Sequence, residues 1–449
     1  MAMMVDSTPK LKTFVRHSLL KETTLALVMR MVTAFISHSG RMSCTQAAGS
    51  AAVHRVHKAQ IVRFLARPRW RSVGINDAYR ALLLQSEGVK QGRFIFIIDS
   101  TSVTQQGKHT QNVSHFGNRT RRPSRKKRFA KVKSAKKNCH SFTFALLITP
   151  SGVRIPFQCP FYTKTYCKAH GLEHRSTAEI AADLIDQLPL PPGADVVVLG
   201  DTAYDAKVVQ DACARRKYTW IVPCNPERVF AGRQGSRPKV RSLLDEWCKY
   251  RLQRVRFSPC QGKYAGYRRL SQYRIGPKIK SRTFYVHQET RQVHSVGNVR
   301  LAFSTMEPEL KKATPEEVKI LMTNDTRSSV SEIVELYSLR WQIELLFKEM
   351  KSTLGLHQYK FKNFAAVEGW VELAVTTTLY LEWYRVTQLK RRGLKEEEIR
   401  WWTRQRLHGI CQAVRLATEE TDLRYIAERI KTDGGIKKLK RLLESKMAA

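Results

Sequence analysis

The sequence predicts an α/β protein in which a β-rich insertion interrupts the core and helical regions flank it. Three observations support this fold class. Two continuous apolar runs of strand length, Phe94–Ile98 and Val196–Leu199, are typical of strands buried on both faces of a sheet. Between about residues 226 and 315, strand-like segments carry many charged residues, which indicates exposed faces. Both ends of the chain read as helical and basic.

The 449 residues suffice for a large core and suggest two or three domains. We expect a helical region, the first part of the core, the insertion, the second part of the core and a helical C-terminal region, over residues 1–88, 89–225, 226–317, 318–386 and 387–449.

The elements of the first part of the core can be placed in order. After the first apolar run, Pro150–Gly152 predicts a tight turn between strands at 141–149 and 153–162. A capping box at Ser176–Glu179 opens a helix that ends before the Pro-rich stretch at 189–193. The second apolar run, a helix from about residue 205 and a strand over 218–224 follow.

The insertion is expected to contain four strands, over 250–258, 264–275, 282–287 and 299–304. A buried strand at 318–323 then resumes the core, and a long helical stretch that includes Tyr337–Lys351 follows. Beyond about residue 386 the basic tail could be a separate piece. Its apolar residues could form a dimer contact or pack on the catalytic core, and both interpretations stay open for Trp401, Trp402, Ile410 and Val414.

The charge of the chain points to a polyanionic partner. Lys and Arg total 79 against 38 Asp and Glu, a formal net charge of +41, so nucleic acid is the first candidate. A membrane surface is disfavoured because the most apolar stretch, Val367–Val386, contains four charged residues and reads as a buried core helix. Nine cysteines without a Cys-x-x-Cys pair argue against a zinc site or a disulfide framework and favour the cytosol.

The N-terminal region contains two short helical patterns, Ser43–Ala48 and His57–Leu65, separated by Gly49-Ser50. This arrangement resembles a helix-turn-helix, whose second helix enters a DNA groove, so residues 1–88 are our candidate DNA-binding region. A plain helical hairpin explains the pattern equally well.

The most informative segment is the helical stretch that begins at Tyr337. Arg340, Glu344 and Lys351 follow at offsets of three, seven and fourteen, which places all four side chains within about 60° around a helix. A carboxylate between two cations suits a site where metal and phosphate meet. An ordinary solvated helix face is the alternative.

Two further carboxylates, Asp99 and Asp201, follow the two buried strands, at the sheet edge where ligand sites form. With Glu344 they supply three carboxylates on three elements. Mg²⁺ prefers oxygen ligands, and two such ions about 3.5–4 Å apart can support an in-line phosphoryl displacement. We therefore expect these three residues to be both catalytic and metal-binding.

The spacing Tyr337, Arg340, Glu344 and Lys351, with Asp99 in Ile98-Asp99-Ser100 and Asp201 in Gly200-Asp201-Thr202, resembles the insertion-sequence-four family of bacterial DDE transposases. The resemblance covers roughly residues 94–357 and implies a ribonuclease H-like catalytic core. It implies a DNA transposase that cuts at element ends and transfers the 3′-hydroxyl into target DNA, with a hairpin intermediate usual in the family.

The resemblance also implies roles for individual groups. Asp99, Asp201 and Glu344 would hold two Mg²⁺ ions, which Mn²⁺ could replace, and Tyr337, Arg340 and Lys351 would bind DNA phosphates. The enzyme would act as a homodimer on double-stranded DNA in the bacterial cytoplasm, associated with the nucleoid. Family members grip a flipped base with an aromatic residue of the insertion, for which the candidates are Trp247, Tyr250 and Tyr264.

Two other functions compete with this interpretation. A stand-alone ribonuclease H-like nuclease would cleave DNA without joining it. A catalytically inactive DNA-binding relic of an element is disfavoured because all three acidic residues are present.

One further segment is unusually basic. Residues 119–137 contain 11 Lys or Arg and lie between two core strands, beside the expected active edge. The segment could follow a DNA backbone, or it could be a solvated loop. We expect DNA contacts from Arg125, Lys126, Lys127 and Arg128.

Overall fold

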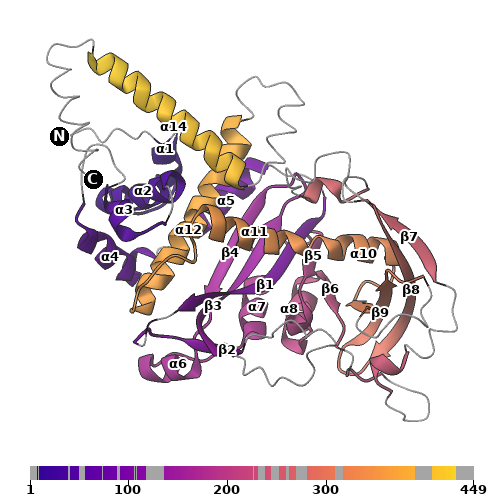
Figure 1. The fold of residues 1–449 in the computed structure, drawn as a ribbon. Helices are drawn as coiled ribbons and strands as arrows, with labels where there is room; N and C mark the ends of the chain where they lie inside the picture. Colours follow the sequence, from indigo (N-terminus) through magenta and orange to yellow (C-terminus); the bar gives the residue numbers. More distant parts are fainter. Residues whose placement is uncertain are drawn as a thin grey trace, which may run out of the picture.

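One large mixed sheet dominates the molecule (Figure 1). The computed structural model describes residues 8, 10–38, 41–49, 56–72, 74–87, 92–105, 107, 109–117, 136–225, 227–230, 238–243, 252–258, 262–268, 281–308, 317–389 and 407–430. Within them the sheet has ten strands in the order β2-β3-β1-β5-β6-β10-β9-β8-β7, and β4 pairs with β3. Helices lie at both ends of the chain, so the expected α/β fold class is confirmed.

The central strands match the apolar runs of the sequence. They are β1 (Phe94–Gln105), β3 (Lys136–Ile148), β4 (Arg154–Pro160), β5 (Val196–Leu199), β6 (Thr219–Pro223) and β10 (Lys319–Thr323). All four residues of β5 are buried, as its continuous apolarity predicted. A short outer strand, β2 (Ser114–Gly117), pairs with the start of β3.

The pairing of these strands brings the ends of several strands together at one edge of the sheet. β1, β5 and β6 are parallel to one another, and β10 is antiparallel to β6. The C-terminal ends of the three parallel strands therefore share an edge with the first residue of β10. The β1–β5 pairing stops at Ile97 and Leu199, whereas β1 continues along β3 as far as Gln105. The two strands separate there, and Asp99 lies just beyond that point.

The insertion extends the core sheet. β9 (Gly297–Thr305) pairs with β10, β8 (Arg282–Val293) pairs with β9, and β7 (Gln253–Phe257) pairs with β8. The expected strand over 264–275 is wrong in its described part, because Ala265–Tyr267 form a 3-10 turn. This segment is held by side chains: Tyr267 donates to the Arg93 carbonyl and Arg268 to Ser338 Oγ.

Helices pack on the sheet between its strands in sequence. α7 (Thr177–Asp186) packs on β3 and on α8 (Lys207–Arg216), and α6 (Lys164–His170) precedes them. The predicted capping box is confirmed, because Ser176 Oγ accepts from Glu179 N–H and Glu179 accepts from Ser176 N–H.

The expected long helical stretch is two helices. α10 (Val330–Ser338) ends before Leu339-Arg340, and α11 (Trp341–Thr353) follows. Both residues keep right-handed helical dihedrals and bond to residues three positions back, so the axis continues with a tightened turn. α10 packs on β6, β8 and β9, whereas α11 packs on β1, and the pair thus crosses the sheet (Figure 1).

The N- and C-terminal helices assemble around α12 (Phe364–Tyr384), which is buried along most of its length. They are α1 (Leu11–Val15), α2 (Glu22–Ser37), α3 (Cys44–Gly49), α4 (Lys58–Ala66), α5 (Ile75–Glu87) and α14 (Leu407–Ile430). α2, α4, α5 and α14 all contact α12 (Figure 1). No helix in the described ranges is long and apolar enough to cross a membrane.

The C-terminal tail packs on its own chain. Ile410 and Val414 are fully buried, and α14 contacts α2, α11 and α12. Of the two interpretations left open by the sequence, intramolecular packing therefore accounts for these two residues. Trp401 and Trp402 lie outside the described residues.

Candidate active site

Asp99 is more buried than Glu344 among the expected catalytic carboxylates. Its side chain is 16% exposed and accepts hydrogen bonds from Ser100 N–H at 2.8 Å and from Arg340 Nη1 at 3.1 Å. Burial raises the pKa of Asp99 to about 6, and the negative charges of Asp201 and Glu344 add to this effect. The Ser100 N–H and the Arg340 guanidinium oppose it. Negative charge is therefore crowded at this edge.

Asp201 lies two residues beyond β5, where its side chain accepts from Ala203 N–H at 2.8 Å and caps a short 3-10 turn, Thr202–Tyr204. Gly200 makes room for this turn, since a Cβ there would lie 2.8 Å from Tyr204 Cβ. The buried Tyr204 hydroxyl meets Ser100 Oγ at 2.8 Å. One hydroxyl contact thus joins the loop that carries Asp201 to the strand that carries Asp99.

Arg340 links two of the carboxylates. Its guanidinium donates to Asp99 and, four residues along the chain, to Glu344 in the first turn of α11. The Arg340 side chain is 17% exposed and the Glu344 side chain is 30% exposed. The structure therefore brings Asp99, Arg340 and Glu344 into direct contact and places Asp201 within electrostatic range of Asp99.

As they stand, no three acidic, His or Cys side chains in the described ranges are close enough to hold a metal ion. Arg340 occupies the position between Asp99 and Glu344 and supplies the positive charge there. The donor set nevertheless fits a hard divalent cation, because three carboxylates offer oxygen ligands. Burial, and then repulsion from Asp201 and Glu344, raises the pKa of Asp99, so negative charge there lacks compensation. A cation would have to replace the guanidinium on these oxygens.

The other two residues of the helical motif flank this centre. Tyr337 lies in the last turn of α10 and is 7% exposed. The Lys319 ammonium lies 4.8 Å from the centroid of the Tyr337 ring. Burial raises the pKa of the Tyr337 hydroxyl. On the other side, Lys351 Nζ donates to Thr101 Oγ1 at 2.7 Å and to the Ser102 carbonyl at 3.1 Å.

The expected DNA-binding residues Arg125, Lys126, Lys127 and Arg128 lie outside the described residues, as do Trp247 and Tyr250. Tyr264, the third candidate for gripping a base, is 1% exposed. Its hydroxyl donates to Glu332 at 2.6 Å and accepts from Arg93 at 3.1 Å. Tyr264 therefore anchors the insertion to the core, and its ring has no free face for a base.

Sequence reasoning missed two residues at this edge. Tyr204 lies in a segment to which no role was assigned, and only Gly200 hinted that a large side chain packs there. Lys319 begins an otherwise buried strand, and a single cation at such a position carries no motif.

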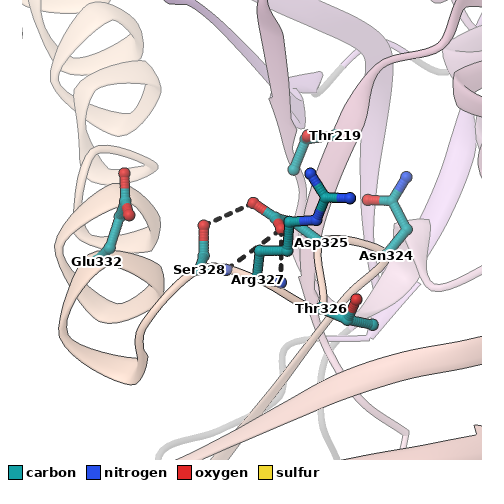
Figure 2. Close-up of a pocket in the computed structure, with 7 residues that line it drawn as sticks. All are labelled: Thr219, Asn324, Asp325, Thr326, Arg327, Ser328 and Glu332. Atoms are coloured by element: carbon teal, nitrogen blue, oxygen red, sulfur yellow. Dashed lines mark hydrogen bonds between the residues drawn. The ribbon is translucent and has the colours of Figure 1, made fainter.

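A separate cavity of about 530 Å³ lies at the opposite edge of the sheet, around the N-terminus of α10 (Figure 2). Asp325 organises it by accepting hydrogen bonds from Arg327 N–H, Ser328 N–H and Ser328 Oγ–H. Its lining also includes Thr219, where β6 begins, and Glu332. The cavity is therefore remote from Asp99.

Sequence comparisons agree with this geometry. No curated protein matched the chain. A protein-family model described as a transposase DDE domain matches residues 90–380, which include Asp99, Asp201, Glu344 and all ten strands of the described sheet. The family acts on DNA, generally with divalent metal ions. The chain therefore belongs to the transposase DDE domain family and is a DDE transposase, a polynucleotidyl transferase and endonuclease.

Proposed function

We propose that this chain is a cut-and-paste transposase of the insertion-sequence-four type. The observation that carries the proposal is the contact of Arg340 with both Asp99 and Glu344, which assembles the helical motif on the strand that carries the first acidic residue. In this proposal it cleaves DNA at the ends of an insertion sequence and transfers the freed 3′-hydroxyl into target DNA, with a hairpin on the excised end.

Asp99, Asp201 and Glu344 would hold two divalent cations, Mg²⁺ with Mn²⁺ as a substitute. When bound, these ions would make the attacking oxygen more acidic and stabilise charge on the leaving oxygen. The Ser100 N–H and the Tyr204–Ser100 contact keep the Asp99 carboxylate in place, and Ala203 N–H does the same for Asp201. Rigid positioning of this kind is what phosphoryl transfer requires.

Tyr337, Arg340 and Lys351 would bind phosphates beside the cleaved bond. Both cations are now bonded to acceptors of their own chain: Arg340 to two carboxylates, and Lys351 to a hydroxyl and a carbonyl. DNA binding would exchange these acceptors for phosphate oxygens. The basic segment, with Arg125, Lys126, Lys127 and Arg128, would add contacts to the backbone.

We place recognition of the element end in the N-terminal helices. α4 packs on α12 through Ile61, Phe64 and Leu65 and exposes Lys58, Gln60 and Arg63, so a polar face remains for DNA. Joining two ends needs two active sites, so the working unit in this proposal is a homodimer on DNA, in the cytoplasm at the nucleoid.

The test uses the full chain with a duplex that carries one terminal inverted repeat of the encoding element. Asp99→Ala, Asp201→Ala and Glu344→Ala should each abolish Mg²⁺-dependent cleavage and leave duplex binding intact. Asp211→Ala is the matched control, because Asp211 is an acidic residue on α8 that pairs with Lys207 at the surface. A variant that still cleaves at near wild-type rate would remove its residue from the catalytic set.

A second assay separates the transposase from a stand-alone nuclease. A duplex with a pre-cleaved 3′-hydroxyl end is incubated with the chain and a supercoiled target plasmid. The proposal requires covalent joining of the end to the target. Cleavage of intact ends without any joined product would favour the nuclease.

A further inference from the structure

Lys319 lies at the same sheet edge as the three carboxylates, although it belongs to no motif. It is the first residue of β10, which runs antiparallel to β6, so it stands where β1, β5 and β6 end. Lys319 is exposed and the remaining four residues of β10 are buried. Its place in the sheet, rather than a mobile loop, therefore presents this cation at the active edge.

The ammonium is held among the groups of the site. It lies 4.8 Å from the centroid of the Tyr337 ring, a cation–π contact that restrains a side chain with many rotamers. Desolvation lowers the pKa of Lys319, the positive charge of Arg340 lowers it further, and the negative charge of Glu344 raises it. Lys319 is thus within electrostatic range of both residues, and two like charges sit side by side.

Lys319 differs from the two cations of the motif in what it is bonded to. Arg340 donates to Asp99 and Glu344, and Lys351 donates to Thr101 and Ser102. Among the described residues, no carboxylate lies within ion-pair distance of Lys319, and its ammonium donates no hydrogen bond there. A phosphate could bind Lys319 without first displacing an acceptor of the protein, and its negative charge would relieve the repulsion from Arg340.

The position of Lys319 also complements that of Lys351. Lys351 is bonded to β1, and Lys319 begins β10, with β5 and β6 between these strands. Three strand spacings correspond to roughly 14 Å, and the carboxylates lie between the two lysines. Two cations on either side of a cleavage centre suit a DNA strand that continues past the cut in both directions.

We propose that Lys319 binds a DNA phosphate on the side of the cleaved bond that lies toward the β-rich insertion of the protein. Lys319 would be a third cation beside Arg340 and Lys351. This inference rests on the proposed function. It adds a phosphate contact whose residue lies on a strand of the core sheet, outside the helical motif.

The experiment measures binding of the end duplex by fluorescence anisotropy in EDTA. KCl is varied between roughly 50 and 300 mM, a range over which phosphate contacts change the affinity strongly. Lys319→Gln should lower the slope of log affinity against log salt by about 0.9. Lys319→Arg should retain the wild-type slope. Lys217→Gln is the charge-matched control, because Lys217 is exposed and lies at the end of α8, where β6 begins.

A second measurement locates the phosphate. Neutral methylphosphonates are placed one at a time on both sides of the cut, and one position should weaken wild-type binding but not binding by Lys319→Gln. Thermal unfolding verifies that the variants are folded, and Lys319→Met, which keeps the stem on the Tyr337 ring, replaces Lys319→Gln if that variant melts early. A wild-type slope in the folded variant, together with methylphosphonate losses identical to wild type at every position, would overturn the inference.

The two proposals fail in different ways. If wild-type protein binds the end duplex and cleaves it, but Lys319→Gln behaves like Lys217→Gln, only the role of Lys319 is wrong. If wild-type protein neither cleaves nor joins DNA, the proposed function is wrong, whatever the slopes show.

Discussion

Replacing Asp99 with Asn should stabilise the metal-free protein at neutral pH. In the folded chain the pKa of Asp99 is about 6, raised chiefly by burial and also by Asp201 and Glu344, against an ordinary value of 3.8. A shift of about 2 units corresponds to about 3 kcal/mol of lost stability once the group is ionised in the folded state. Asn carries no charge and keeps the acceptor for Ser100 N–H, so it avoids this cost.

The sign and the pH range follow from linkage. Because the folded-state pKa is raised, ionisation destabilises the fold, and the loss accumulates as the pH rises from about 4 to about 6. The advantage of Asp99→Asn should be about 3 kcal/mol at pH 7, smaller at pH 5 and nearly absent at pH 4. These are upper limits, since Asn also loses the charge-assisted bond from Arg340 Nη1.

The assay is thermal unfolding in EDTA at pH 4, 5 and 7, with Asp211→Asn as the surface control. For a chain of this length, 1 kcal/mol shifts Tm by about 1 °C, so the expected gain at pH 7 is up to about 3 °C. The variant should at the same time lose cleavage. A Tm difference from wild type that is the same at all three pH values would refute the reasoning, because it would mean that the pKa of Asp99 is not raised in the folded chain. A variant that falls further below wild type as the pH rises would mean that the Arg340 pair outweighs the burial of Asp99.

Three further outcomes are expected. Four cations of the basic segment can be replaced together with Ala: Arg125, Lys126, Lys127 and Arg128. The slope of log affinity against log salt for duplex binding should then fall by up to about 3.6, and an unchanged slope would mean that the segment does not touch DNA. Gly369→Ala should destabilise the fold by about 1–3 kcal/mol, since its Cβ would lie 2.4 Å from the Leu65 carbonyl oxygen; Gly266→Ala, which meets nothing within 4 Å, should melt like wild type. Removing residues 390–449 should lower Tm, because the truncation uncovers the helices on which α14 packs; equal melting curves would contradict this.

Continuous apolarity predicted the centre of the sheet well. Phe94–Ile98 and Val196–Leu199 became β1 and β5, because strands buried on both faces need apolar residues at every position. The extension of β1 to Gln105 was missed. Its residues alternate exposed and buried, but they are mostly Ser and Thr, so the alternation is not visible as a hydrophobic pattern.

The helical motif lies on helical backbone as predicted, although on two helices instead of one, and its contacts could not be deduced. The spacing of Arg340 and Glu344 predicts their pairing, because residues four apart face each other on a helix. The second bond of Arg340, to Asp99, joins residues far apart in the sequence and depends on how α11 packs on β1. Neither Pro nor Gly marks the tightened turn at Leu339-Arg340, so a single helix was the natural expectation.

The shared sheet constrains how this sequence can evolve. Backbone pairing runs from β1 through β5, β6 and β10 to β9, β8 and β7, so the register of each strand pair links the catalytic core to the insertion in one continuous sheet. Residues can be added at the turn between β8 and β9, over 294–296, without shifting that register. Loss of one residue within β10 would reverse the faces of the side chains on one side of the deletion and disrupt the pairing of β10 with β6 and β9. Length variation among homologous chains should therefore concentrate at the hairpin tips and spare residues 319–323.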